Sequence, residues 1–173
     1  TLLKLHVNDF PSKTEVIIVD DASTDGTDSY KFPNISPIKI IRLRNSARLG
    51  KSGSILAGYS IASGEHIALT DADLYNCIPA LITQYQNIET GYATTYTQFS
   101  FKHVFSSRMH RGPKIFPRAV FSHLSPTTLN EWNIEAELVY TARNLGLPVF
   151  KTKCDTPHHS RPKPLFSKLK KIL

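Results

Sequence analysis

The chain has 173 residues, of which 40% are hydrophobic and 20% charged, and its formal net charge is +7. This composition is typical of one globular domain with a sizeable core and excludes a disordered or low-complexity chain. The positive charge predicts a partner that carries negative charge, whether a phosphate, a nucleic acid or an anionic lipid.

The sequence contains neither a long apolar run nor a dense set of cysteines. No apolar stretch approaches the roughly 20 residues of a membrane-spanning helix, and residues 1–7 lack the layout of a secretory signal. Cys77 and Cys154 are too few and too far apart for a disulfide framework or a zinc site. We therefore expect a soluble or peripheral protein with two reduced thiols in a cytosolic setting.

The first half of the chain alternates between strand and helix patterns. In chain order these are the end of a helix over 1–7, a strand over 15–19, a short helix over 28–32, a strand over 38–43, a helix over 50–63 and a strand over 66–70. Small residues fill the helix over 50–63, with a predicted buried stripe of Leu49, Leu56, Tyr59 and Ala62, and Gly64 ends it.

The second half continues the same alternation. It predicts a helix over 79–89, strands over 92–104 and 114–116, helices over 117–123 and 131–145, and a strand over 147–151. Gly146 ends the last helix. This order of elements predicts an α/β fold with mostly parallel strand pairing.

Two acidic clusters follow predicted strands. Asp20 and Asp21 end the strand over 15–19, and Asp71 and Asp73 follow the strand over 66–70. The carboxyl ends of parallel strands face the ligand crevice of an open α/β sheet, and Mg²⁺ or Mn²⁺ would relieve the repulsion between such carboxylates while bridging two phosphates. These residues therefore predict a site for a nucleoside diphosphate and a metal ion. The alternative is that they are ordinary turn and N-cap aspartates.

Four segments resemble family 2 glycosyltransferases of the GT-A fold. They are EVIIVDDASTDGT at 15–27, NSARLGKSGSILAGYSIASGEHIALTDADL at 45–74, RGPKIFPRAVF at 111–121 and WNIEAELVYTARNLGLPVF at 132–150. The last two are similar to the enzymes that load a hexose onto dolichyl or another polyprenyl phosphate. The resemblance implies a Rossmann-like three-layer α/β/α domain over 1–161, with a mostly parallel central sheet that lacks the family's first strand.

The resemblance also implies roles for the strand-end residues. Asp20 and Asp21 would hold the base and ribose of a nucleotide sugar, and Asp71 would lie near the ribose or sugar. Asp73 would ligate the metal ion, Mg²⁺ or Mn²⁺. Lys51 would lie near the nucleotide, where its charge suits a phosphate.

Three further residues are carried over from the downstream segments. Lys114 and Arg118 occupy the basic stretch that the family places near the acceptor phosphate, and with Asp73 they form the expected catalytic set. Glu137 matches a glutamate expected to order the site.

The implied reaction is attack by a polyprenyl phosphate oxygen on the anomeric carbon of a UDP-glucose or GDP-mannose type donor, with inversion. A phosphate is a competent nucleophile near neutral pH, so no strong general base is needed. The alternatives are a catalytically inactive remnant, suggested by the missing strand and by Arg108 where the family has an aspartate, and a basic protein that binds nucleic acid or membranes. We expect no nucleic-acid partner.

Residues 162–173 form a separate basic tail. After two prolines, the apolar residues share a helical stripe opposite Lys168, Lys170 and Lys171. Such a segment is typical of an amphipathic helix on an anionic membrane, and an exposed tail is the alternative. With a lipid phosphate as acceptor, the expected location is cytoplasmic and peripheral, on the cytoplasmic face of a membrane through residues 165–173.

Overall fold

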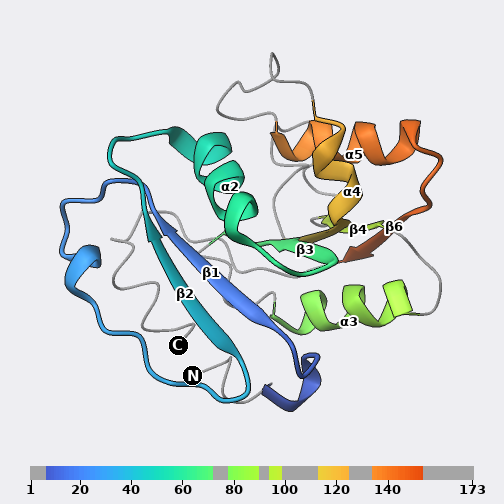
Figure 1. The fold of residues 1–173 in the computed structure, drawn as a ribbon. Coiled ribbons are helices and arrows are strands. Elements are labelled where there is room, and N and C mark those ends of the chain that lie inside the picture. The colour runs from blue at the N-terminus through green and yellow to red at the C-terminus, as the bar shows by residue number, and fades with distance from the viewer. Residues whose placement is uncertain (1–6, 72–77, 90–93, 99–112, 125–133, 154–173) are drawn as a thin grey trace.

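The computed structural model describes residues 7–71, 78–89, 94–98, 113–124 and 134–153 (Figure 1). The strands are β1 (Glu15–Asp20), β2 (Lys39–Arg44), β3 (His66–Leu69), β4 (Thr94–Gln98), β5 (Lys114–Pro117) and β6 (Val149–Lys153). The helices are α2 (Gly50–Ile61), α3 (Ile78–Glu89), α4 (Arg118–Ser122) and α5 (Ile134–Asn144), with the 3₁₀ turns η1 (Val7–Asp9) and η2 (Thr27–Ser29).

These elements confirm the alternation predicted from the sequence, with one exception among the described residues. The helix expected over 28–32 is absent, and the 3₁₀ turn η2 takes its place. The side chain of Asp25 accepts hydrogen bonds from the amide and hydroxyl of Thr27, which favours a tight turn over a regular helix. Residues 1–6 of the helix expected over 1–7 and the ends of the strand expected over 92–104 lie outside the described residues.

The strands form two hydrogen-bonded sheets. β1 pairs with β2 in parallel, and the second sheet has the order β3-β5-β4-β6. β5 is antiparallel to both β3 and β4, whereas β4 and β6 are parallel, so β5 alone runs against the other strands of its sheet. Among the described strands, none joins the edge of β1 to that of β3.

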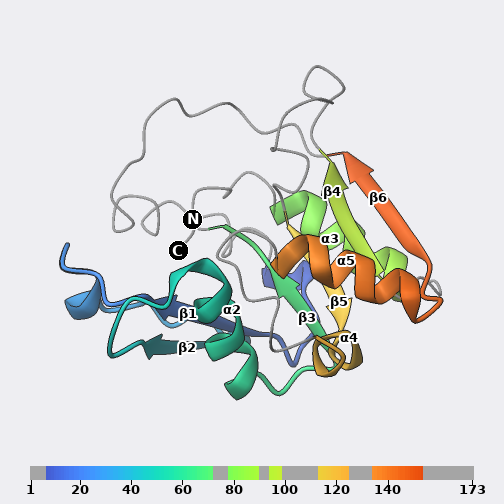
Figure 2. The same cartoon turned by 90° about the horizontal axis from the view of Figure 1, so that it is seen from above.

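Helices cover both faces of the strands, as a three-layer fold requires. α2, α4 and α5 lie on one face and α3 on the other (Figures 1 and 2). Alternate residues of β1 face the two layers: Ile17 and Val19 lie under Gly58 of α2, while Val16 and Ile18 pack against a cluster that includes Ile78 and Ile82 of α3.

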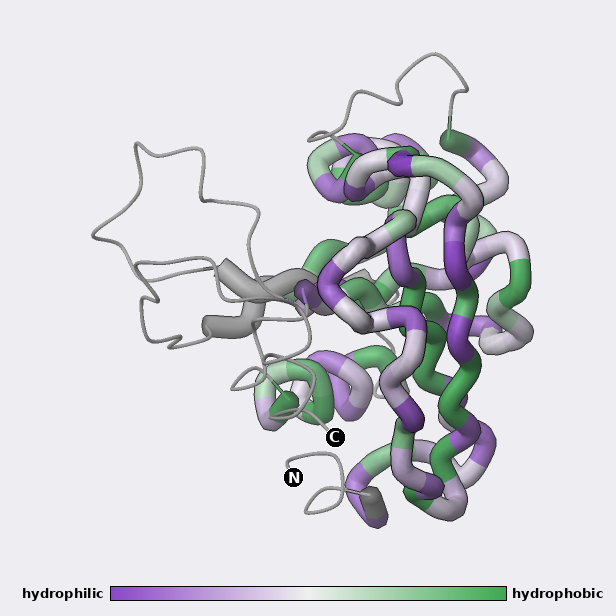
Figure 3. Tube along the Cα trace, turned by 90° about the vertical axis from the view of Figure 1, so that its left-hand side faces the viewer, coloured by the Kyte–Doolittle hydropathy of each residue, from purple (hydrophilic) through white to green (hydrophobic). Residues whose placement is uncertain are grey.

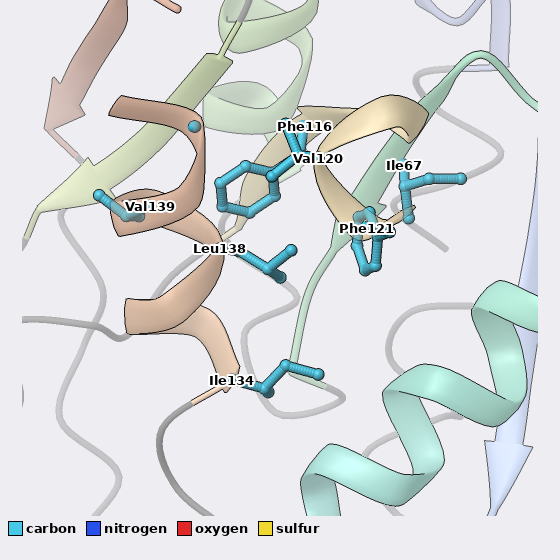
Figure 4. Close-up of a cluster of buried hydrophobic side chains, with 8 residues drawn as sticks. Ile67, Phe116, Val120, Phe121, Ile134, Leu138 and Val139 are labelled. Atoms are coloured by element: carbon cyan, nitrogen blue, oxygen red, sulfur yellow. The ribbon is translucent and has the colours of Figure 1, made fainter. Parts of the chain in front are cut away.

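The main hydrophobic core lies between the four-stranded sheet and the helices α4 and α5 (Figure 4). Its most deeply buried residues are Phe116, Val120, Ile134, Leu138 and Ala142. The three from α5 are spaced four residues apart, so they form one stripe of the helix. In Figure 3, hydrophobic and hydrophilic stretches alternate along the chain, as expected for elements with one buried face.

The predicted buried stripe of α2 is corrected at one position. Leu56, Tyr59 and Ala62 pack against the main core, but the side chain of Leu49 is 52% exposed. Leu49 precedes the first helical residue, so it does not continue the buried face. No helix in the described parts of the chain has the length and apolar character needed to cross a bilayer.

Candidate functional site

Two of the strand-end carboxylates contact the N-terminal end of α2. Asp21 directly follows β1 and accepts hydrogen bonds from the amides of Leu49 and Gly50. Asp71 follows β3 and lies 2.8 Å from the ammonium group of Lys51. Both acids thus contact the first residues of α2, one from the end of β1 and the other from the end of β3.

Asp20, the last residue of β1, is fully buried. Its carboxylate accepts hydrogen bonds from the amide of Ser23, at 2.9 Å, and from the guanidinium of Arg44, at 2.6 Å. Burial acts to raise its pKa, but the hydrogen bonds from Ser23 and the charge of Arg44 outweigh burial and hold the pKa below its usual value. These contacts hold the end of β1 against β2. The predicted role of Asp20 in nucleotide binding stays a prediction.

Asp21 joins the loop after β2 to the start of α2. Besides the amides of Leu49 and Gly50, at 2.8 and 3.0 Å, its carboxylate accepts a 2.8 Å hydrogen bond from the side-chain amide of Asn45. Burial acts to raise its pKa, yet these donors lower it overall. Gly50 has a φ of 71°, a conformation that favours glycine.

A chain of alternating charges extends from Asp71 into the protein. Lys51 pairs with Asp71 at 2.8 Å and with Glu135 at 3.3 Å, and Glu135 also pairs with Lys114 at 3.3 Å. Burial acts to lower the pKa of Lys51, but the two carboxylates raise it overall. The four residues come from the end of β3, α2, α5 and β5, so the ion pairs join four elements.

Lys114 is the buried end of this chain of charges. Its side chain is fully buried, and burial lowers its pKa even though Glu135 opposes that shift. Its predicted role near an acceptor phosphate stays a prediction. What the structure provides is a buried cation next to Lys51 and Asp71.

Glu135 is the site residue that the sequence analysis missed. It lies on the first turn of α5, next to the buried stripe that begins at Ile134, and it is itself buried. That stripe was readable from the sequence, because Ile134, Leu138 and Ala142 repeat every four residues. A glutamate adjacent to such a stripe is partly enclosed, and an enclosed carboxylate requires a cation or hydrogen-bond donors.

The structure places Arg118 apart from these residues. Its guanidinium donates to the backbone carbonyls of Ala62 and Gly64 and lies 5.1 Å from the ring centre of Tyr59. This is the turn that leads into β3, at the end of the strand opposite to Asp71. These contacts fasten the turn to α4. Glu137 is half-buried on α5, and its ordering role stays a prediction.

Asp73, the predicted metal ligand, lies outside the described residues. Within the described ranges, no group of three or more histidines, cysteines or acids is arranged to hold a metal ion. Asp71 supplies a carboxylate at the β3 end, of the hard oxygen type that Mg²⁺ and Mn²⁺ bind, but Lys51 is already paired with it.

Comparison with known families assigns the chain to a class. Residues 1–146 match the model of glycosyl transferase family 2. Because this match spans most of the sequence, the chain belongs to that family. A search of curated protein sequences found no match.

Two solved structures share its fold. A mannosyltransferase from Pyrobaculum calidifontis, in complex with GDP-Man and Mn²⁺, has a TM-score of 0.65 and 19% identity, over 88% of this chain and 51% of that one. This chain thus spans about half the length of that protein. A 4-diphosphocytidyl-2C-methyl-D-erythritol synthase from Anaerococcus prevotii has a TM-score of 0.56 and 12% identity, over 98% of this chain and 87% of that one. Together with the family match, these structures identify the α/β class as the Rossmann-like GT-A fold.

Proposed function

We propose that this chain binds a nucleotide sugar at the N-terminal end of α2 and transfers its hexose to a polyprenyl phosphate. The observation that carries the proposal is the Lys51–Asp71 pair, which lies at a helix N-terminus next to Asp21. A helix N-terminus and a lysine both favour the negative charge of a diphosphate. Membership of family 2 supports a nucleotide-sugar donor.

The reaction would proceed by a single displacement. A phosphate oxygen of the acceptor forms a bond to the anomeric carbon while the bond from that carbon to the diphosphate oxygen breaks, and the electron pair leaves with the nucleoside diphosphate. The configuration at carbon is thereby inverted. Lys51 would stabilise the negative charge that develops on the leaving diphosphate.

A divalent cation, held by Asp73, would neutralise part of the same diphosphate charge when bound. The mannosyltransferase of similar fold is complexed with GDP-Man and Mn²⁺, which supports metal use. The net charge of +7 supports an anionic acceptor. The choice of a polyprenyl phosphate rests on the sequence resemblance of 111–121 and 132–150.

Calorimetry with UDP and with GDP, each with and without Mn²⁺, tests the donor site. We expect one nucleotide to bind in a metal-dependent manner and Asp73→Asn to abolish that dependence while the melting temperature is kept, because the substitution removes a charged oxygen ligand. Asp28→Asn, in the 3₁₀ turn η2 and with an exposed side chain, is the control for loss of one negative charge. Unchanged affinity in Asp73→Asn would remove this residue from the metal site.

A catalytically inactive nucleotide-binding protein is the second candidate. It is favoured by the break between β1 and β3 among the described strands and by the full engagement of the carboxylates of Asp20 and Asp21 within the protein. Incubation with radiolabelled UDP-glucose or GDP-mannose, polyprenyl phosphate and Mn²⁺ distinguishes the two. Labelled lipid product supports the transferase, and nucleotide binding without product supports the inactive protein.

A further inference from the structure

We propose that Glu135 is a positioning residue: it holds the ammonium group of Lys51 in place to bind the diphosphate of a nucleotide. The inference rests on the proposed donor site and assigns a specific role to a residue that does not itself contact the ligand. The position of the Glu135 carboxylate between two lysines supports it. A single carboxylate oxygen, Oε1 of Glu135, lies 3.3 Å from Nζ of Lys51 and 3.3 Å from Nζ of Lys114.

The two lysines differ in what they can reach. The side chain of Lys114 is fully buried, whereas that of Lys51 is 33% exposed and begins in the first turn of α2. Only Lys51 can therefore contact a ligand without a rearrangement of the core. Lys114 lies inside the protein, where its charge offsets that of the Glu135 carboxylate.

Lys51 is held from two directions. Asp71 approaches from the end of β3 at 2.8 Å, and Glu135 approaches from α5 at 3.3 Å. An ammonium group has three N–H donors. When two of them point at these carboxylates, the direction of the third is fixed as well. A lysine with one partner rotates about its flexible stem, whereas two partners on separate rigid elements define its position.

Asp71 alone is the competing explanation for the position of Lys51. The carboxylate of Asp71 is 28% exposed and that of Glu135 is 9% exposed. Solvent screens the first pair more than the second, so the contact from Glu135 is the better shielded constraint. If Asp71 were sufficient, neutralising Glu135 would leave nucleotide binding unchanged once the fold is preserved.

Preserving the fold requires a paired substitution. Glu135→Gln alone removes the carboxylate that lies 3.3 Å from the buried ammonium group of Lys114, and the resulting loss of stability would obscure any effect on binding. Lys114→Met removes that cation, so Glu135→Gln can be measured in the Lys114→Met background. Melting temperatures of both proteins verify that they are folded to the same extent, and Glu65→Gln, an exposed acid at the start of β3, is the control for charge.

The measurement is calorimetric binding of UDP and GDP in the presence of Mn²⁺. In the Lys114→Met background we expect Glu135→Gln to weaken nucleotide binding by about tenfold, the effect of a lost charged hydrogen bond. In a background that carries both Lys51→Met and Lys114→Met we expect Glu135→Gln to cause no further weakening, because Glu135 acts through Lys51. Equal affinity in the first comparison, or the same loss with and without Lys51, overturns the proposal.

These outcomes are separate from failure of the proposed function. If the wild-type protein binds neither UDP nor GDP with Mn²⁺, the donor site itself is disproved, and the inference about Glu135 is disproved with it. If the wild-type protein binds nucleotide and the paired variants bind as tightly as their backgrounds, the donor site stands and only the role of Glu135 is rejected.

Discussion

At the scale of single residues, Asp21 connects the end of β1 to the start of α2. Its carboxylate accepts hydrogen bonds from the amides of Leu49 and Gly50, groups that a helix start leaves without intrahelical partners. We expect Asp21→Ala to lower the free energy of unfolding by about 1 to 2 kcal/mol, as loss of a helix cap does. Denaturant unfolding measures the change. Asp28→Ala removes an exposed carboxylate and should have a much smaller effect; equal losses would contradict the capping role.

The acid sensitivity of the protein follows from the carboxylates of Asp20 and Asp21. Each has a folded-state pKa below the ordinary value of 3.8. Their hydrogen bonds therefore stabilise the fold fully above about pH 4, and this contribution is lost as the pH falls through the folded-state pKa. We expect the free energy of unfolding to fall more steeply below pH 4 in the wild type than in Asp20→Asn. Parallel curves for the two proteins would show that Asp20 does not contribute.

The individual site residues differ in how far the sequence reveals them. Asp20, Asp21 and Asp71 were predicted together because they follow recognisable strands, and Lys51 was added by the family resemblance. Glu135 and the burial of Lys114 were not, because the partner of a charged side chain depends on how α5 and β5 pack, which local patterns do not determine. The contacts of Arg118 with the backbone carbonyls of Ala62 and Gly64 were not predicted for the same reason, and its role near an acceptor phosphate stays a prediction.

At the scale of elements, Gly58 determines how closely α2 approaches β1. A Cβ at this position would lie 3.1 Å from Cγ2 of Val19, so a larger side chain requires α2 to move away from the strand. We expect Gly58→Val to lower the free energy of unfolding by about 1 to 3 kcal/mol, the usual cost of overpacking. Ser60→Val places the same side chain on the exposed face of α2 and is the matched control. A similar result for both variants would show that close packing at Gly58 is unimportant.

The existence and type of most elements follow from the sequence alone. Apolar runs that end in turn residues identified β1, β2 and β3, an amphipathic pattern identified α3, and Gly146 marked the end of α5. The exception at η2 has a local cause, since a hydrogen bond between the side chains of Asp25 and Thr27 competes with helix formation. Leu49 was misplaced because the stripe was extended one residue beyond the start of the helix.

At the scale of the whole molecule, strand pairing was the least predictable feature. The reversal of β5 between β3 and β4 depends on connections that carry no pairing signal of their own. The GT-A fold also does not fix the chemistry, because the two structures of similar fold are named as a mannosyltransferase and as a synthase of a diphosphocytidyl compound. The proposed transfer therefore rests on the family match and on the charges around Lys51.

The net charge of +7 is a property of the whole chain, and it bears on the proposed location at a membrane surface. Residues 165–173, which lie outside the described residues, carry Lys168, Lys170 and Lys171 among apolar residues. Each lysine near an anionic membrane contributes about 1 kcal/mol of attraction. We therefore expect deletion of 165–173 to reduce binding to phosphatidylserine-containing vesicles, and added salt to weaken binding of the intact chain.

Vesicle co-sedimentation separates the contributions of charge and apolar surface. Replacement of the three lysines by glutamine should remove the salt-sensitive part of the binding and leave the apolar contribution. The matched control is replacement of Lys13, Lys31 and Lys39, three lysines of the folded part of the chain, which lowers the net charge equally. A specific anchor depends on where the charges lie, whereas attraction by overall charge does not. If both triple variants lose the same amount of binding, overall charge and not the tail attracts the protein to the membrane.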